Sequence, residues 1–205
     1  MTYATTIALM LLLFGCEAKQ EEPGPSIGDS ASPSGGASDT GPSAGNLSGR
    51  NCGTGTITGN GIGDLRLGVT PAAVRASCVV VRDTTRLASE GQLARMIAVA
   101  FPRDTVEAEI VDSRVWRIEV LSPRFRTADS LGVGTPLRRL LALRDPRGIT
   151  GEGQLFVVSP EHCGLSFRLS DNGSSSRTQD WNRAALSRLP SGTAVNKILI
   201  VGCVP

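Results

Sequence analysis

The chain of 205 residues is poor in the side chains that most catalytic and stacking sites use. It has one histidine, which excludes metal sites or proton transfer built on several histidines. Aromatic residues make up only 4%, too few for the stacked platforms that bind bases or sugars. The net charge of +2 argues against a strongly basic nucleic-acid binder. We therefore expect no nucleic-acid partner, no metal and no cofactor.

Long apolar runs are also missing. The apolar run at residues 7–14 is shorter than the roughly 20 residues that cross a bilayer, and it fits the core of a secretory signal. It ends in Leu13-Phe14-Gly15-Cys16, which resembles the signal of bacterial lipoproteins. That resemblance implies a signal peptide at 1–15 and an acylated, palmitate-bearing Cys16. The alternative is a plain signal peptide with an incidental cysteine.

The segment after Cys16 has the composition of a tether. Of the 34 residues at 17–50, 18 are Gly, Ser or Pro, and no hydrophobic period is present. Such a segment cannot bury enough surface to fold, and as a coil it would reach roughly 30–35 Å. We predict a lipidated cysteine and disordered tether at 16–50. Glu17, rather than Asp, follows the cysteine, which by resemblance favours the outer over the inner membrane of a bacterial envelope.

Four cysteines remain for the region 51–205. An even number in an exported domain indicates two disulfides, although four cysteines allow three pairings. A pairing of Cys52 with Cys78 and of Cys163 with Cys203 would close each half of the domain on itself, and we favour it weakly. No C-x-x-C spacing points to zinc or a redox pair.

Two similar stretches suggest an internal repeat. Thr70-Pro71 and Thr135-Pro136 each combine a capping hydroxyl with a proline at the first helical position, and apolar residues at helical spacing follow. Each predicted helix of about 8–10 residues precedes strands. In the first half these are 94–101, 105–111 and 115–121, and in the second half 155–158, 165–169 and 195–201. Shorter strands are predicted at 55–58 and 65–67, and a short helix at 181–189.

We therefore predict an α+β domain made of a duplicated unit, in which one helix is followed by three strands. The repeat halves are about 51–124 and 125–205. Together they would form one curved antiparallel sheet with helices on one face and the other face open.

A family resemblance rests on residues 61–74, which read GIGDLRLGVTPAAV. This helix entry resembles the repeats of β-lactamase-inhibitor-protein-like domains and the small outer-membrane assembly lipoproteins of the SmpA/OmlA type, with Val69 where a methionine is usual. The tandem arrangement and the lipoprotein signal are similar to uncharacterised exported lipoproteins. The resemblance implies an extracytoplasmic binding or scaffold role without a catalytic centre.

Motifs that could carry chemistry are weak. The glycine-rich stretch 54–63 lacks the Lys and Ser/Thr of a phosphate loop, and Asp171 opens a segment without the full ligand set of a calcium loop. His162 stands beside Cys163, but a disulfide would make that thiol inert. Glu107 and Glu109 share a strand face, which an exposed polar surface explains. We predict that the protein is not an enzyme.

The loop 170–192 is the best candidate for a partner-binding insertion, because tryptophan and arginine anchor many interfaces. Its candidate contacts are Arg177, Trp181, Arg183 and Arg188. Trp181 also suits a structural role, fastening a short helix to the sheet, and Trp116 is predicted to lie in the core. The function that we expect is a membrane-tethered binding or envelope-scaffold lipoprotein. An inhibitor of a secreted enzyme is the alternative, and a hydrolase with an unrecognised site ranks below both.

Overall fold

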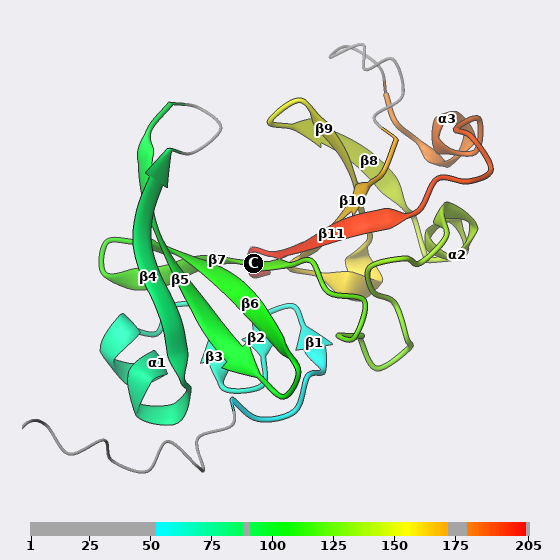
Figure 1. Cartoon of the computed structure of the whole chain (residues 1–205). Helices are drawn as coiled ribbons and strands as arrows, with labels where there is room; N and C mark the ends of the chain where they lie inside the picture. Colours follow the sequence, from blue (N-terminus) through cyan, green and yellow to red (C-terminus); the bar gives the residue numbers. More distant parts are fainter. Residues whose placement is uncertain (1–51, 88–90, 172–179, 204–205) are drawn as a thin grey trace, which may run out of the picture. The chain divides into compact units, whose positions relative to one another are not determined.

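The computed structural model describes residues 52–87, 91–171 and 180–203 (Figure 1). The expected signal peptide, Cys16 and tether lie outside the described residues, as does Arg177. Within the described part, 45% of the residues are in strands or bridges and 13% are helical. The domain is therefore mostly β.

Eight antiparallel strands form one sheet in the order β4-β5-β6-β7-β11-β10-β9-β8. Their bounds are β4 Val80–Leu87, β5 Leu93–Phe101, β6 Asp104–Val111, β7 Arg114–Val120, β8 Arg147–Gly151, β9 Gln154–Val158, β10 Leu165–Leu169 and β11 Val195–Ile200. Consecutive strands pair within each group of four, and β7 pairs with β11 to join the two groups (Figure 1).

Short elements pack against this sheet. A small three-stranded sheet and four helical turns complete the described fold; their bounds are β1 Ile57–Thr58, β2 Gly61–Ile62, β3 Leu65–Arg66, α1 Pro71–Ser77, α2 Leu137–Leu141, the 3₁₀ turn η1 Pro160–His162 and α3 Arg183–Leu186. As predicted, Thr70 caps α1, and its hydroxyl accepts the amide of Ala73 at 3.2 Å. At α2 the residue in the cap position is Pro136, which has no capping side chain, and Thr135 instead accepts the amide of Gly132.

The predicted fold class is wrong. A duplicated unit of one helix and three strands in an α+β domain does not describe a molecule with one eight-stranded sheet, a second three-stranded sheet and helices of at most seven residues. The six strands expected in the large sheet are present within about two residues at each end, and two more were missed. Both missed strands, β4 and β8, lie at the edges of the sheet.

The missed strands are those that cannot show an apolar alternation. Residues Val81–Leu87 of β4 are all exposed, and β8 has no buried residue. When both faces of an edge strand are exposed to solvent, neither face has to be apolar. Its sequence then need not alternate between apolar and polar residues, and periodicity does not reveal the strand. Their existence is decided by pairing with β5 and β9.

One core lies between the large sheet and the elements that cover it. Val74 of α1, Leu140 of α2, Leu186 of α3 and Leu65 of β3 belong to the same buried cluster as the inward residues of the large sheet. Along β6, Val106, Ala108 and Ile110 face this core, as their alternation predicts, while Glu107 and Glu109 face the opposite side, which we call the open face.

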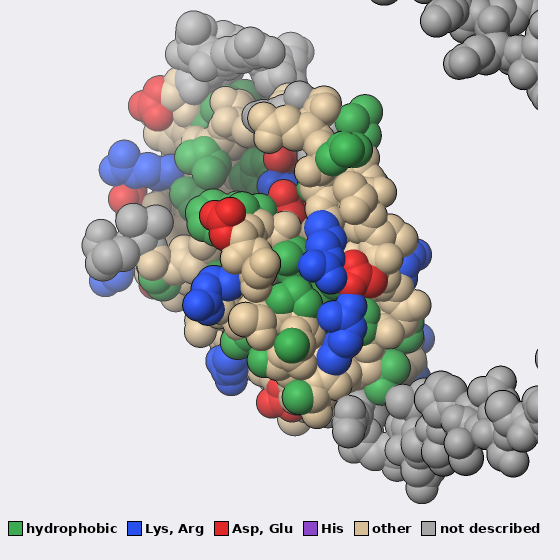
Figure 2. All heavy atoms as spheres, turned by 90° about the vertical axis from the view of Figure 1, so that its left-hand side faces the viewer, with side chains coloured by type: hydrophobic (Ala, Val, Ile, Leu, Met, Phe, Trp, Pro, Cys, Tyr) green, Lys and Arg blue, Asp and Glu red, His purple; other side chains and the backbone are tan. Residues whose placement is uncertain are grey.

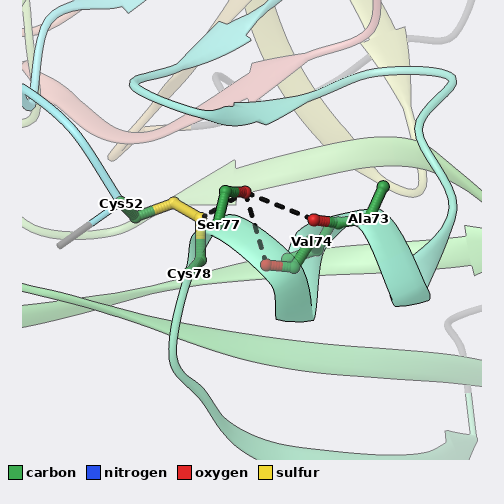
Figure 3. The surroundings of a disulfide bond; sticks show 5 residues. All are labelled: Cys52, Ala73, Val74, Ser77 and Cys78. Atoms are coloured by element: carbon green, nitrogen blue, oxygen red, sulfur yellow. Dashed lines mark hydrogen bonds between the residues drawn. A yellow bond between two sulfur atoms is a disulfide. The ribbon is translucent and has the colours of Figure 1, made fainter. Parts of the chain in front are cut away.

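Both disulfides join distant segments of the described chain. Cys52 bonds to Cys78, with Cα atoms 4.5 Å apart, and Cys163 bonds to Cys203, with Cα atoms 5.1 Å apart. This is the weakly favoured pairing of the three. Figure 3 shows that the first bond ties the chain before β1 to the end of α1, beside Ser77, whose hydroxyl hydrogen-bonds within the helix. A seven-residue helix is only marginally stable by itself. The disulfide at Cys78, the C-cap of α1, holds the end of this helix against the segment before β1.

Replacing both cysteines of this bond, Cys52→Ser with Cys78→Ser, is expected to lower the free energy of unfolding by about 3 kcal/mol, because a 26-residue loop is no longer closed in the unfolded chain. Urea unfolding followed by circular dichroism measures the difference. Under reducing conditions, the difference in the free energy of unfolding between the wild type and this variant should become smaller. A variant that is as stable as the oxidised wild type would contradict the prediction.

Candidate partner-binding surface

The open face of the large sheet carries a row of residues set directly opposite one another. The row consists of Arg82, Ala98, Glu107, Glu119, Leu199 and Ser166. Two carboxylates, Glu107 and Glu119, are therefore cross-strand neighbours on β6 and β7. Like charges in this arrangement repel each other, so the pair persists only if cations compensate it.

Cations surround the two carboxylates from both sides. Arg82 and Arg86 of β4 both bind Glu107, and Arg86 also lies 3.8 Å from Glu119. Arg82 reaches Glu107 across β5, whose residue in the row is Ala98; the small side chain leaves room for the arginine stem and is itself buried. Two guanidinium groups thus share one carboxylate at the β4 edge.

Glu119 is the most deeply buried acid of this face. Only 6% of its side chain is exposed, and Lys197 of β11 binds it at 2.6 Å. Arg117 lies 3.6 Å from Glu119, and also binds Glu109 and Glu152 at 2.9 Å. Burial works against the charged form of Arg117, but the three acids outweigh it and raise the pKa of its guanidinium. These ion pairs tie β6, β7 and β11 together.

Trp116 is exposed, which corrects its predicted place in the core. Its side chain is 66% accessible. The register between β6 and β7 shifts at this point, because Glu109 pairs with Arg117 and Ile110 pairs with Val115, so that Trp116 is the extra residue of a β-bulge. The sequence carried one sign of this, since Val115 and Trp116 are adjacent apolar residues and strict alternation cannot bury both.

A hollow of about 660 Å³ lies beside Trp116. It is where β7 changes partner: the backbone of Val115 hydrogen-bonds to Gly68 and Val69, whereas Ile118–Val120 pair with β11. The hollow is lined by Asn60, Leu67, Gly68, Val111, Asp112, Arg114, Val115, Trp116, Val201, Gly202 and Cys203. Val111 and Val201 are exposed there, so an apolar patch surrounds the indole. We call this hollow the Trp116 groove.

A second hollow of about 410 Å³ continues from the Trp116 groove. The two share Val201 and Gly202, and the second adds Ile149 of β8 and Val158 of β9, so apolar side chains extend across the end of the open face. Large contiguous patches of exposed apolar surface are uncommon on monomeric proteins and often mark interaction sites.

His162 lies in the second hollow, where it pairs with a carboxylate. Its Nε2 is 3.1 Å from the Asp129 carboxylate, and its ring packs edge-on against Phe167. Partial burial opposes ionisation of Asp129, yet the Thr127 hydroxyl and His162 outweigh it and lower the pKa of this carboxyl. Among the described residues, no serine or cysteine side chain hydrogen-bonds to His162, and Cys163 is held in a disulfide. The pair holds η1 in place rather than forming a triad.

The residues proposed from the loop 170–192 have structural positions where they are described. Trp181 is 5% exposed, and Arg183 donates to the carbonyl oxygens of Leu141 and Leu143, at 2.9 Å for Leu143. Trp181 thus fits the fastening role that the sequence also allowed. Arg188 is exposed, and nothing in the described structure assigns it a partner.

The described residues contain neither a membrane-spanning helix nor a metal cluster. No described helix is long and apolar enough to cross a membrane. No group of three or more His, Cys, Asp or Glu side chains in the described part is arranged to hold a metal ion. Figure 2, which views the domain from the side of β4, shows basic, acidic and apolar side chains interleaved on that face.

Comparison with known proteins gives a fold but no activity. No protein-family model matches the chain, and no curated protein matches it. Among solved structures, the uncharacterized protein yfeY from Escherichia coli is similar, with a TM-score of 0.50 and 17% sequence identity over 70% of this chain and 97% of that one. At this identity the similarity concerns the fold alone.

Breaking the buried ion pair is expected to cost more than breaking an exposed one. Glu119→Gln should lower the free energy of unfolding by about 2 kcal/mol, because Lys197 loses its charged acceptor while still partly buried. Urea unfolding of Glu119→Gln, Lys197→Met and the double variant measures their coupling. Asp145→Asn, which removes an exposed pair with Arg147, is the control and should change stability by less than about 1 kcal/mol. Additive effects of the first two changes contradict the prediction.

Proposed function

We propose that the protein is an exported, lipid-anchored module that binds a protein partner through the Trp116 groove. The observation that carries this proposal is the exposed tryptophan in an apolar hollow. Tryptophan is the residue type most enriched in the energetic centres of interfaces, and a large exposed one costs solubility unless something covers it. Arg114, which donates to the Gly68 carbonyl at 2.7 Å, lines the same hollow and contributes a positive charge to it.

Export is supported by the covalent chemistry of the domain. Two disulfides among the four cysteines of 52–203 fit an oxidising compartment, because cytosolic thiols are kept reduced. The apolar run before Cys16 and the Gly15-Cys16 dipeptide supply a secretion signal and an acylation site. Acyl chains and a tether would hold the domain near, but clear of, the bacterial envelope, with the outer membrane favoured.

A binding role fits the surface better than catalysis does. The hollows are wide and expose mostly apolar surface, with Trp116, Val111, Val201 and Ile149 among the lining residues, while Glu119 of the open face is already paired with Lys197. A partner would therefore meet apolar anchors with polar groups around them, the arrangement of a protein interface.

The anchor is tested by Cys16→Ser. In a Gram-negative host fed radiolabelled palmitate, this variant should lose the label and move from the membrane pellet to the soluble fraction, because the acceptor thiol is gone. Glu17→Gln keeps the thiol and should remain labelled and sedimenting. Label retained on the Cys16→Ser protein would refute acylation at this position.

The partner site is tested by a photo-crosslinking residue in place of Val111, which is exposed in the Trp116 groove, so that the indole stays in place; the full chain is used, in the envelope of the producing bacterium. One adduct of defined mass should form there, and Val201→Asp should abolish it, because a charge in the groove repels an apolar anchor. The same probe at Arg188 samples the loop segment that the sequence suggested. An adduct at 188 alone, or at neither position, argues against the groove as the binding site.

A further inference from the structure

The eight-stranded sheet treats its two edges differently. At β8 the edge is closed: the amide of Gly148 donates to the carbonyl of Trp181 at 2.6 Å, and the two residues form a β-bridge. Gly148 is required for this contact, because a Cβ there would lie 2.5 Å from that of Trp181. α3 follows directly, and its residues contact β8.

At β4 no described strand pairs with the outer edge. The strand runs for eight residues, and from Val81 to Leu87 every one is exposed. A bulge interrupts its pairing with β5 only between Val80 and Arg82, and the register from Arg82 to Leu87 is continuous. The backbone N–H and C=O groups of alternate residues therefore face outward in a regular row, the arrangement to which another strand can add.

Charged side chains on an edge strand usually hinder the pairing of another strand, but those of β4 bind residues of α1, β5 and β6 instead of extending over the outer edge. Asp83 is bound by Arg75 of α1 and by Arg95 of β5, at 2.8 Å for Arg95, and Arg95 followed by Arg75 lowers the pKa of Asp83 to about 2. Arg82 and Arg86 reach toward Glu107 over the open face. None of these contacts covers the outer side of the β4 backbone.

The open-face side of this edge is positive. Arg82 and Arg86 are two residues either side of Thr84, and both depend on the single carboxylate of Glu107, with Glu119 at 3.8 Å from Arg86 already bound by Lys197. A strand added beside β4 places every second side chain on this face. Carboxylates four residues apart in that strand would stand opposite the two arginines and complete their charge balance.

A second copy of the chain fits this edge poorly. The antiparallel self-pairing that uses all of Val81–Leu87 is centred on Thr84 and sets Arg82 opposite Arg86 twice. Like charges directly opposite are destabilising, whereas an acidic strand is favoured at the same positions.

We propose that the outer edge of β4 is a docking site for an extended acidic segment of another protein, which joins the sheet as a ninth strand with carboxylates opposite Arg82 and Arg86. The site is separate from the Trp116 groove and does not depend on the lipid anchor, so either proposal can fail alone.

The probe is a fluorescein-labelled, acetylated peptide of sequence Thr-Glu-Val-Thr-Val-Glu-Thr, titrated into the full chain in detergent and followed by anisotropy. Binding should slow hydrogen exchange of alternate amides in 81–87, which are exposed in the free protein, and leave 147–151 unchanged. Arg82→Gln with Arg86→Gln should weaken binding about tenfold, since each exposed pair contributes a few-fold. The matched control is Arg147→Gln on the closed edge, which should bind as the wild type does.

Two further peptides keep the test independent of how the variants fold. A peptide with lysines in place of the glutamates should not bind wild-type protein, and one N-methylated at alternate backbone nitrogens should fail because it cannot complete the ladder. Equal binding by the lysine or methylated peptide, unchanged exchange in 81–87, or protection of β4 that grows with protein concentration in the absence of peptide would each overturn the proposal, the last in favour of a second copy.

Discussion

The continuity of the sheet depends on a short seam between β7 and β11. Three residue pairs join these strands: Ile198 with Val120, Leu199 with Glu119, and Ile200 with Ile118. Every other contact between neighbouring strands of the sheet lies within one group of four. Four of the five aliphatic side chains in these pairs are fully buried on the core face, while Leu199 lies on the open face, where Lys197 and Glu119 bridge the seam. The seam thus combines non-directional burial on one side with a directional ion pair that opposes slippage in register on the other.

The same seam explains where the candidate surfaces lie. β7 is longer than the stretch that β11 pairs with, so its first residues turn to the segment before α1 for hydrogen bonds. The bulge at Trp116 falls in this transition, and the groove is the space left between the two partners of one strand. An exposed indole here is a result of topology, because a strand shared between two partners cannot be regular along its whole length.

Sequence reasoning succeeded where burial imposes a period and failed where it does not. The alternation of Val106, Ala108 and Ile110 located β6 and its inward face correctly. Neither β4 nor β8 could be found in this way, because only Val80 at the start of β4 packs against the core and β8 has no buried residue. Without these two strands, the sequence predicted an α+β arrangement in place of a largely β one. The position of Trp116 required the bulge, which depends on hydrogen bonds between strands rather than on the composition of either. The cysteine pairing was within reach because only three arrangements exist, and the charges around Glu119 were not, because their partners are as many as 78 residues apart.

Closure of the β8 edge by Trp181 also limits how the protein can assemble. A sheet with two open edges can stack end to end without limit, and the product is a fibre. With one edge blocked, whatever pairs with β4 ends the chain of contacts at once, whether it is a foreign strand or another copy. The backbone bridge between Gly148 and Trp181 at β8 therefore limits assembly: the protein can keep one edge open for pairing, and the assemblies that it can form stay finite.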